Sequence, residues 1–513
     1  MTPRAFPSFR IKLVLTLGLV VLADLAFWTA PGGTAVGAAA LAWTAAVLAV
    51  IPAVWRDRQA RVAAAGAALL AAGMLDRPGV PAWALFWMAL TLAVLLPRSP
   101  RFDDALRWFQ RLAFHTIIGQ FGPLLDGLRL GRLWTKGRRG RVLPVIAALV
   151  LPVAGGALFL ALFSAANPII ADLIAKLRLP AFDLWRAVFW GFAAITVWAT
   201  LRPRLMRQPI RVTIARPVRP PPGVSVLSVT LSLGLFNALF ALQNGLDIAF
   251  LWSGARLPQG VTFAEYAHRG AYALMATALL AGLFVLAALR PGTATAASRP
   301  IRGLVTLWVA QNVFLVASSI LRTWDYVEAY SLTNLRIAAL LWMGLVAVGL
   351  VLICWRLLRG HSAAWLVNAN AIAALAVLLP ASQVDFSAIT AAWNVRHARE
   401  VGGPGVALDL GYMRSLGPAA LIPLVELERR PLAPQFADRV AYVRGELTSD
   451  LVIRQGQWRS WSFRGQRRLA RAEALLGPSP RIPLAGDRDY SAHLQSASQP
   501  APQPAPLTSP PTR

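Results

Sequence analysis

The sequence predicts an all-α integral membrane protein: a polytopic bundle of about eleven spanning helices followed by a small helical domain outside the membrane. Of its 513 residues, 57% are hydrophobic and only 14% are charged, whereas soluble domains have about 25% charged residues. Apolar runs recur at close to the length of about 20 residues that a helix needs to cross the hydrocarbon core. Arginine is concentrated in alternate loops between these runs, which is the signal that orients inner-membrane proteins.

The apolar runs fall within residues 1–380. The run at 62–75 is the weakest, because Asp76 and Arg77 follow it directly. The first run is long enough to span and further apolar runs follow at once, so we expect a retained first helix rather than a cleaved signal. The expected spans lie near 11–28, 33–55, 62–75, 80–96, 142–164, 185–201, 224–246, 267–289, 302–321, 335–355 and 363–379.

The distribution of basic residues predicts the orientation. The loops before odd-numbered spans are rich in arginine, most densely at 98–141 and 202–219, and the alternate loops hold few basic residues. This asymmetry predicts a cytoplasmic amino terminus in a bacterial inner membrane. With eleven spans, the C-terminal domain lies on the extracytoplasmic side. If 62–75 does not cross, the side of every later segment is reversed.

The charge balance limits the partners. The net charge is +28, from 51 basic and 23 acidic residues, and such an excess can indicate nucleic acid. Because the arginines lie in short loops between apolar runs, we instead predict contact with membrane lipid and no nucleic acid. A protein partner or a small-molecule substrate is left open.

The sequence indicates no cofactor and no metal site. The lone Cys354 lies in an apolar run and cannot form an internal disulfide or a cysteine metal site. The five histidines show no HxxxH or HExxH pairing. Phosphate-binding loops, dinucleotide fingerprints and nucleophile elbows are absent from the sequence as well.

Three further segments have recognisable patterns. In residues 103–118, Leu106, Phe109 and Ile117 share one helical face, which predicts a helix lying on the membrane surface. Residues 381–476 mix charge with helical periodicity and predict a helical extramembrane domain. Residues 477–513 are rich in Pro, Ser and Gln and predict a disordered tail.

The most polar stretch of the apolar part runs from 237 to 272. It begins inside one apolar helix and ends inside the next, with polar residues at three-, four- and seven-residue spacings that place them on one face of each helix. Polar residues of the ninth and tenth spans are expected on the same side of the membrane. Together they form the predicted polar pocket, which comprises Asn244, Asp247, Glu265, His268, Arg269, Tyr272, Gln311, Asn312, Arg322, Tyr326, Tyr330 and Arg336.

Two interpretations of this pocket remain open. In the functional one, His268 beside Glu265 shuttles protons, because histidine titrates near neutrality, and arginines such as Arg322 bind a carboxylate or phosphate. In the structural one, the charged residues form an ion-pair belt at the headgroups, and the amides join neighbouring helices. Asp24, a lone acid near the outer end of the first span, is expected to reach toward the membrane surface.

Five pieces of the sequence occur in an order that resembles a known family. They are NGLDIAFLWSGARLPQGVTFAEYAHRGAY, QNVFLVASSILRTWDYVEAYSLTNLRIAALLWM, AAWNV, LDLGYMRSLG and WRSWSF. They resemble the bacterial multi-pass membrane family catalogued as domain of unknown function 4173, which is related to family 4153. The resemblance covers roughly residues 225–475. It implies an integral membrane protein and supplies neither an activity nor functional residues.

Three functions are consistent with these patterns. The first is transport or ligand sensing through an outward-facing polar pocket, which we rank above the others. The second is a membrane enzyme acting at the outer leaflet on a lipid-linked or anionic substrate, with Asp247, Glu265 and His268 beside arginines. The third is a structural or assembly protein whose contact surfaces are the C-terminal domain, the tail and the basic loops.

Overall fold

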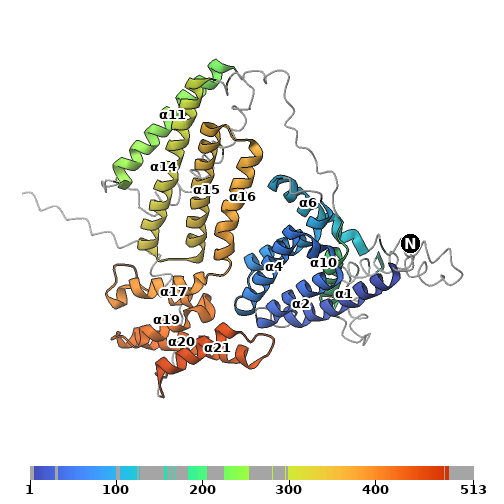
Figure 1. Ribbon diagram of the computed structural model, residues 1–513. Coiled ribbons are helices and arrows are strands. Elements are labelled where there is room, and N and C mark those ends of the chain that lie inside the picture. Colours follow the sequence, from blue (N-terminus) through green and yellow to red (C-terminus); the bar gives the residue numbers. More distant parts are fainter. Residues whose placement is uncertain are drawn as a thin grey trace, which may run out of the picture. The chain divides into compact units, whose positions relative to one another are not determined.

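The computed structural model describes residues 5–28, 33–99, 104–123, 183–204, 225–252, 298–478 and 480–483, together with isolated positions such as Asp126. Every regular element in these ranges is a helix, and no strand occurs in them, so the predicted all-α class is confirmed (Figure 1). The chain divides into two compact units, Met1–Arg211 and Val212–Arg513. We call them the N-terminal and C-terminal units and describe each by itself.

The N-terminal unit is built from apolar helices and one amphipathic helix. Its elements are α1 (Ala5–Phe27), α2 (Thr34–Val50), α3 (Ala53–Arg56), α4 (Arg58–Asp76), α5 (Val80–Leu95), η1 (Leu96–Arg98), α6 (Ala105–Ile118), η2 (Gly119–Phe121) and α10 (Leu184–Leu201). Three of the helices begin where an aspartate side chain accepts a backbone N–H, at Asp57, Asp104 and Asp183. Such acceptors satisfy N–H groups that a helix start leaves without a partner.

A close helix crossing joins α2 to α4. A Cβ atom added at Gly37 would lie 2.3 Å from the backbone nitrogen of Leu75, so only glycine allows the two backbones to come this near. Beside it, the hydroxyl of Thr34 donates to the carbonyl of Leu75 at 2.9 Å.

The C-terminal unit begins with four long helices. They are α11 (Val226–Asp247), α14 (Arg299–Tyr330), α15 (Asn334–Arg359) and α16 (Ala363–Ala381), and each packs against the next in this order (Figure 1). The Trp308 ring lies 5.2 Å from Phe236 and 5.7 Å from Phe240, which joins α11 to α14. A short turn connects α14 to α15, and Ser331 adopts a positive φ of 69° in it.

Smaller helices cover one end of α14, α15 and α16 (Figure 1). We call them the terminal helices: α17 (Phe386–His397), η4 (Arg399–Val401), α18 (Leu410–Ser415), η5 (Gly417–Ala420), α19 (Leu421–Glu428), α20 (Pro434–Gly456) and α21 (Phe463–Leu476). They have their own hydrophobic core, in which Met413, Leu421, Leu424 and Val440 are fully buried. These helices lie within the predicted domain 381–476, and most of the predicted tail lies outside the described residues.

Six helices of the described ranges are long and apolar enough to cross a membrane. They are Val80–Arg98, Leu184–Leu201, Val226–Asp247, Arg299–Tyr330, Asn334–Arg356 and Ala363–Ala381. A shorter apolar helix is Thr34–Val50. The predicted spans 11–28 and 62–75 lie on α1 and α4, which are not among the six, and 142–164 and 267–289 lie almost entirely outside the described residues. The count of eleven therefore stays a prediction.

Candidate functional site

Polar side chains connect α11 to α14 along their interface. The Asn237 amide donates to the Leu304 carbonyl of α14 at 3.1 Å and to the Leu233 carbonyl of its own helix at 2.8 Å. In return, the Gln311 amide donates to the Asn237 side-chain oxygen at 2.7 Å. Two turns further along α11, the Asn244 amide donates to the Gln311 carbonyl at 3.3 Å. Each helix thus supplies donors to the other.

An enclosed ion pair continues this interface. The Asp247 carboxylate accepts hydrogen bonds from the Arg322 guanidinium and, at 2.9 Å, from the Gln243 amide. The side chains are 0% exposed for Asp247 and 4% for Arg322. Ionised groups in an apolar environment persist when they are paired. We call Asn237, Gln311, Asn244, Asp247 and Arg322 the polar row.

The backbone changes conformation directly after Asp247. Residues Ile248–Trp252 form a π-helical turn, a feature that is frequent at functional sites. The turn directs Trp252 toward α14, where its indole donates to the Ser318 hydroxyl at 3.1 Å and its ring stacks on Phe314 at 5.6 Å. The turn therefore continues the contacts between this segment and α14 beyond Asp247.

Buried acceptor oxygens occur on both helices that carry the polar row. Asn312 is fully buried and its amide donates to the Trp308 carbonyl at 2.8 Å. In the described part of the chain, the side-chain oxygens of Asn312, Asn244 and Gln311 have no hydrogen-bond partner. Buried oxygens of this kind are typical places for a bound water, ion or polar solute.

The remaining described residues of the predicted pocket form a separate group at the α14–α15 turn. The rings of Tyr326 and Tyr330 lie 4.7 Å apart, and the Arg336 guanidinium lies 4.3 Å from the Tyr326 ring centroid. Arg336 donates to the carbonyls of Tyr330, at 2.8 Å, and of Ser331. These contacts favour the structural interpretation of Arg336, because its donors close the turn.

Four predicted pocket residues cannot be placed. Glu265, His268, Arg269 and Tyr272 lie outside the described residues, so proton transfer by His268 stays a prediction. Gln243 was missed, although its spacing of four residues from Asp247 places both on one face of α11. Within the described ranges, no group of three His, Cys, Asp or Glu side chains is arranged to bind a metal ion.

The expectation that Asp24 stands alone is wrong. Its carboxylate accepts from the Arg186 guanidinium and the Trp190 indole, each with a bond of 2.8 Å. Arg186 and Trp190 are four residues apart on α10, which places both on the face that meets α1. Asp24 therefore joins two helices instead of reaching alone toward the surface.

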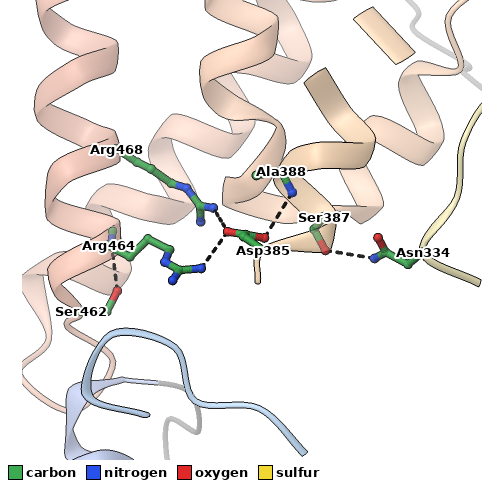
Figure 2. Close-up of polar contacts among 8 residues, drawn as sticks. Asn334, Asp385, Ser387, Ala388, Ser462, Arg464 and Arg468 are labelled. Atoms are coloured by element: carbon green, nitrogen blue, oxygen red, sulfur yellow. Dashed lines mark hydrogen bonds and ion pairs between the residues drawn. The ribbon is translucent and has the colours of Figure 1, made fainter. Parts of the chain in front are cut away.

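A second polar group attaches the terminal helices to the long helices (Figure 2). Asp385, four residues after α16, accepts the Ala388 N–H at the start of α17. Its other oxygen accepts from Arg464, at 2.9 Å, and from Arg468, both on α21. At the start of α15, the Asn334 amide donates to the Ser387 hydroxyl at 3.0 Å.

A side-chain amide completes this attachment. The Asn394 side chain accepts from the Leu332 N–H at 2.8 Å and donates to the Leu332 carbonyl at 3.0 Å. Leu332 belongs to the α14–α15 turn. In the last turns of α14, the Trp324 ring lies 5.3 Å from the ring of Trp393 on α17. The terminal helices therefore lie at the end of α14 that carries Arg322.

Comparison with known proteins gives a family and no function. The family model described as Domain of unknown function (DUF4153) matches residues 42–427. No curated protein matches the chain, and no solved structure does so. The matched range begins within α2 and ends in α19. The family shown is 4153, so the expected resemblance to the related family 4173 over 225–475 stays a prediction. Because the match covers most of the chain, this protein belongs to the DUF4153 family.

Proposed function

We propose that this protein is a multi-pass protein of a bacterial inner membrane that transports or senses a small polar or ionic solute along the polar row. The observation that carries the proposal is the enclosed ion pair between Asp247 and Arg322, which joins two helices long and apolar enough to cross a membrane. Ionisable residues at such positions commonly mark substrate and ion pathways.

The energetics favour a use beyond helix attachment. Amides that join helices inside a bilayer contribute only about 0.6 kcal/mol each on average, and apolar contacts would serve as well. An enclosed ion pair adds little net stability, because desolvation offsets most of the attraction. The buried oxygens of Asn244, one helical turn before Asp247, and of Asn312 on α14 offer acceptors to a cation or to a solute with N–H or O–H groups.

We further propose that the amino terminus is cytoplasmic and that the terminal helices are extracytoplasmic. In the N-terminal unit, Lys12, Arg98 and Arg202 lie close together, which supports the predicted alternation of basic loops. From the five sequence pieces we also expect a close relation to family 4173.

Water access along the polar row tests the proposal. Cys354 is the only cysteine, so Cys354→Ser provides a background for single cysteines at Gln311, Ser318 and Leu307. Leu307 is an exposed apolar residue of the same helix and serves as the lipid-facing control. Membrane-impermeant methanethiosulfonate reagents react with thiolates in contact with water.

We expect Ser318→Cys and Gln311→Cys to react at least tenfold faster than Leu307→Cys, and a transported or sensed solute to slow that reaction. Equal, slow reaction at all three positions would show a dry helix interface, and the polar row would then be structural.

A further inference from the structure

Basic residues from three segments meet at one end of the N-terminal unit. Arg202 and Arg204 follow α10 and approach the two carboxylate oxygens of Asp126 at 3.2 and 3.1 Å. Arg98, at the end of η1, donates to the carbonyl of Pro203. Asp126 also accepts from the Trp198 indole at 3.1 Å and is largely buried.

A fourth cation comes from α1. Lys12 is half-buried and lies within electrostatic range of Arg98, Arg202 and Asp126. We call Lys12, Arg98, Arg202 and Arg204 the basic cluster. Two of its four cations, Arg202 and Arg204, contact the Asp126 carboxylate. Among the residues named here the cluster therefore has three more positive charges than negative ones, in a partly buried region. Repulsion between like charges is strong where water is partly excluded, and a bound anion would offset it.

Histidine adds no charge to the basic cluster at neutral pH. His115 on α6 is fully buried and lies close enough to Arg98 for its charge to be felt. Burial is the main cause that lowers the pKa of His115 from 6.5 to about 4. The imidazole is therefore neutral at pH 7, and it does not compensate the arginines.

The helix beside the basic cluster presents an apolar surface to the outside. On α6, Phe109 is 67% and Ile117 63% exposed, whereas Trp108, Arg111 and His115 are buried. The predicted amphipathic helix thus directs Arg111 and His115 inward and the large apolar side chains Phe109 and Ile117 outward, and an outward apolar face suits contact with lipid. Residues just after α6 connect to the basic cluster through Arg204, which donates to the Gly122 carbonyl at 3.3 Å.

We propose that the basic cluster binds the phosphate group of an anionic phospholipid, whose acyl chains lie along the apolar face of α6. Guanidinium groups match phosphate oxygens in geometry, and lysine adds a compact charge. Basic pockets between membrane helices bind anionic headgroups in the same way. The same chemistry would accept free inorganic phosphate, which the experiment below distinguishes from lipid.

The test measures lipid binding to the full chain in zwitterionic detergent, by native mass spectrometry with added phosphatidylglycerol or phosphatidylcholine. We expect the wild type to prefer phosphatidylglycerol, with a preference that falls as salt rises. The double variant Lys12→Gln/Arg98→Gln should bind phosphatidylglycerol at least tenfold more weakly. The matched control, Arg56→Gln/Arg58→Gln, removes two exposed charges of the same unit and should change binding less than twofold.

Two further arms complete the test. The variant Lys12→Gln/Arg98→Gln reduces the repulsion between like charges, so its unfolding temperature should not fall. The lipid preference of the wild type is measured on the unchanged protein and so does not depend on the folding of any variant. Displacement of phosphatidylglycerol by millimolar inorganic phosphate, with phosphate binding on its own, would assign the basic cluster to free phosphate. An absent preference for anionic lipid together with no phosphate binding, or equal binding by both double variants, would overturn the proposal.

Discussion

The two units each contain an acid inside an apolar helix, and they neutralise it differently. In the N-terminal unit, Asp24 of α1 pairs with Arg186 of α10, whose side chain is 40% exposed. In the C-terminal unit, Asp247 pairs with Arg322, which is enclosed. A pair that reaches the helix surface keeps part of its solvation, whereas an enclosed pair loses it. The first pair therefore serves as a contact between helices, and the second forms a buried polar site inside the C-terminal unit.

The side chains around the two ion pairs also differ, because an aromatic ring lies beside the first pair and amide side chains lie near the second. The Trp190 indole donates to Asp24, and the Arg186 guanidinium lies 5.3 Å from the Trp190 ring centroid. One aromatic ring, that of Trp190, thus lies against the first pair. Near the second pair, Asn244 and Gln311 continue the polar contacts along the helix interface, and these residues are the basis of the path proposed above.

The largest expected effect comes from removing the carboxylate of the enclosed pair. Asp247→Asn should lower the free energy of unfolding by about 3–5 kcal/mol, because it removes the charge that accepts from the buried Arg322 guanidinium. Thermal unfolding in detergent measures this. The double variant Asp247→Asn/Arg322→Gln should recover most of the loss, and a double variant as unstable as the single one would show that the charges are not the cause.

Acid should destabilise the N-terminal unit through His115. Its pKa of about 4 in the folded protein lies below its ordinary value of 6.5, so the unfolded chain takes up a proton first as the pH falls. The stabilisation is complete above pH 6.5 and is lost as the pH falls toward 4. The loss amounts to about 3 kcal/mol at most.

His115→Leu isolates this contribution. Unfolding of the wild type and of the variant between pH 7 and 4 should give two curves that differ in slope, with the variant less sensitive to acid. Parallel curves would mean that the imidazole does not stay neutral in the folded protein.

An ion pair of intermediate exposure should give an intermediate effect. Asp385→Asn removes the charge that accepts from Arg464 and Arg468 and should cost about 2 kcal/mol. Hydrogen exchange of α21 should become faster. The control Glu426→Gln breaks a more exposed pair with Arg471 on the same helix and should change exchange little. Equal effects of both changes would contradict the dependence on exposure.

The pair of the N-terminal unit, in which the guanidinium is the exposed member, should be less sensitive than the enclosed pair. Asp24→Asn leaves Arg186, whose side chain is 40% exposed, at the helix surface. We expect a smaller decrease in unfolding temperature than for Asp247→Asn. A decrease as large as that of Asp247→Asn would remove the distinction between the two pairs.

The smallest effect is expected for a single amide of the polar row. Gln311→Leu removes the donor to Asn237 and should lower the free energy of unfolding by about 0.6 kcal/mol. In the Ser318→Cys background, Gln311→Leu should also change the rate at which the thiol is labelled in the presence of solute. This change in rate should be larger than the small loss of stability alone would produce. If stability falls and labelling does not change, Gln311 acts only between the helices.

Helix positions followed from local information. Apolar runs predicted α5, α10, α11 and α14 to α16, since a helix interior needs only its own backbone hydrogen bonds and a suitable length. The amphipathic spacing of Leu106, Phe109 and Ile117 placed one face of α6 outward, and these side chains are exposed. The sequence by itself therefore determined the fold class, these helices and the outward face of α6.

Only the tertiary structure decided which charges meet. Asp24 and Arg186 are 162 residues apart, and Asp247 and Arg322 are 75 residues apart. Periodicity assigns a side chain to a face of its helix, but the partner depends on which helix packs there and at what height. The partners of Arg336 were likewise decided by the tertiary structure. Its guanidinium reaches the Ser331 carbonyl because the chain turns at Ser331, which has a positive φ. The polar row and the basic cluster are products of that packing.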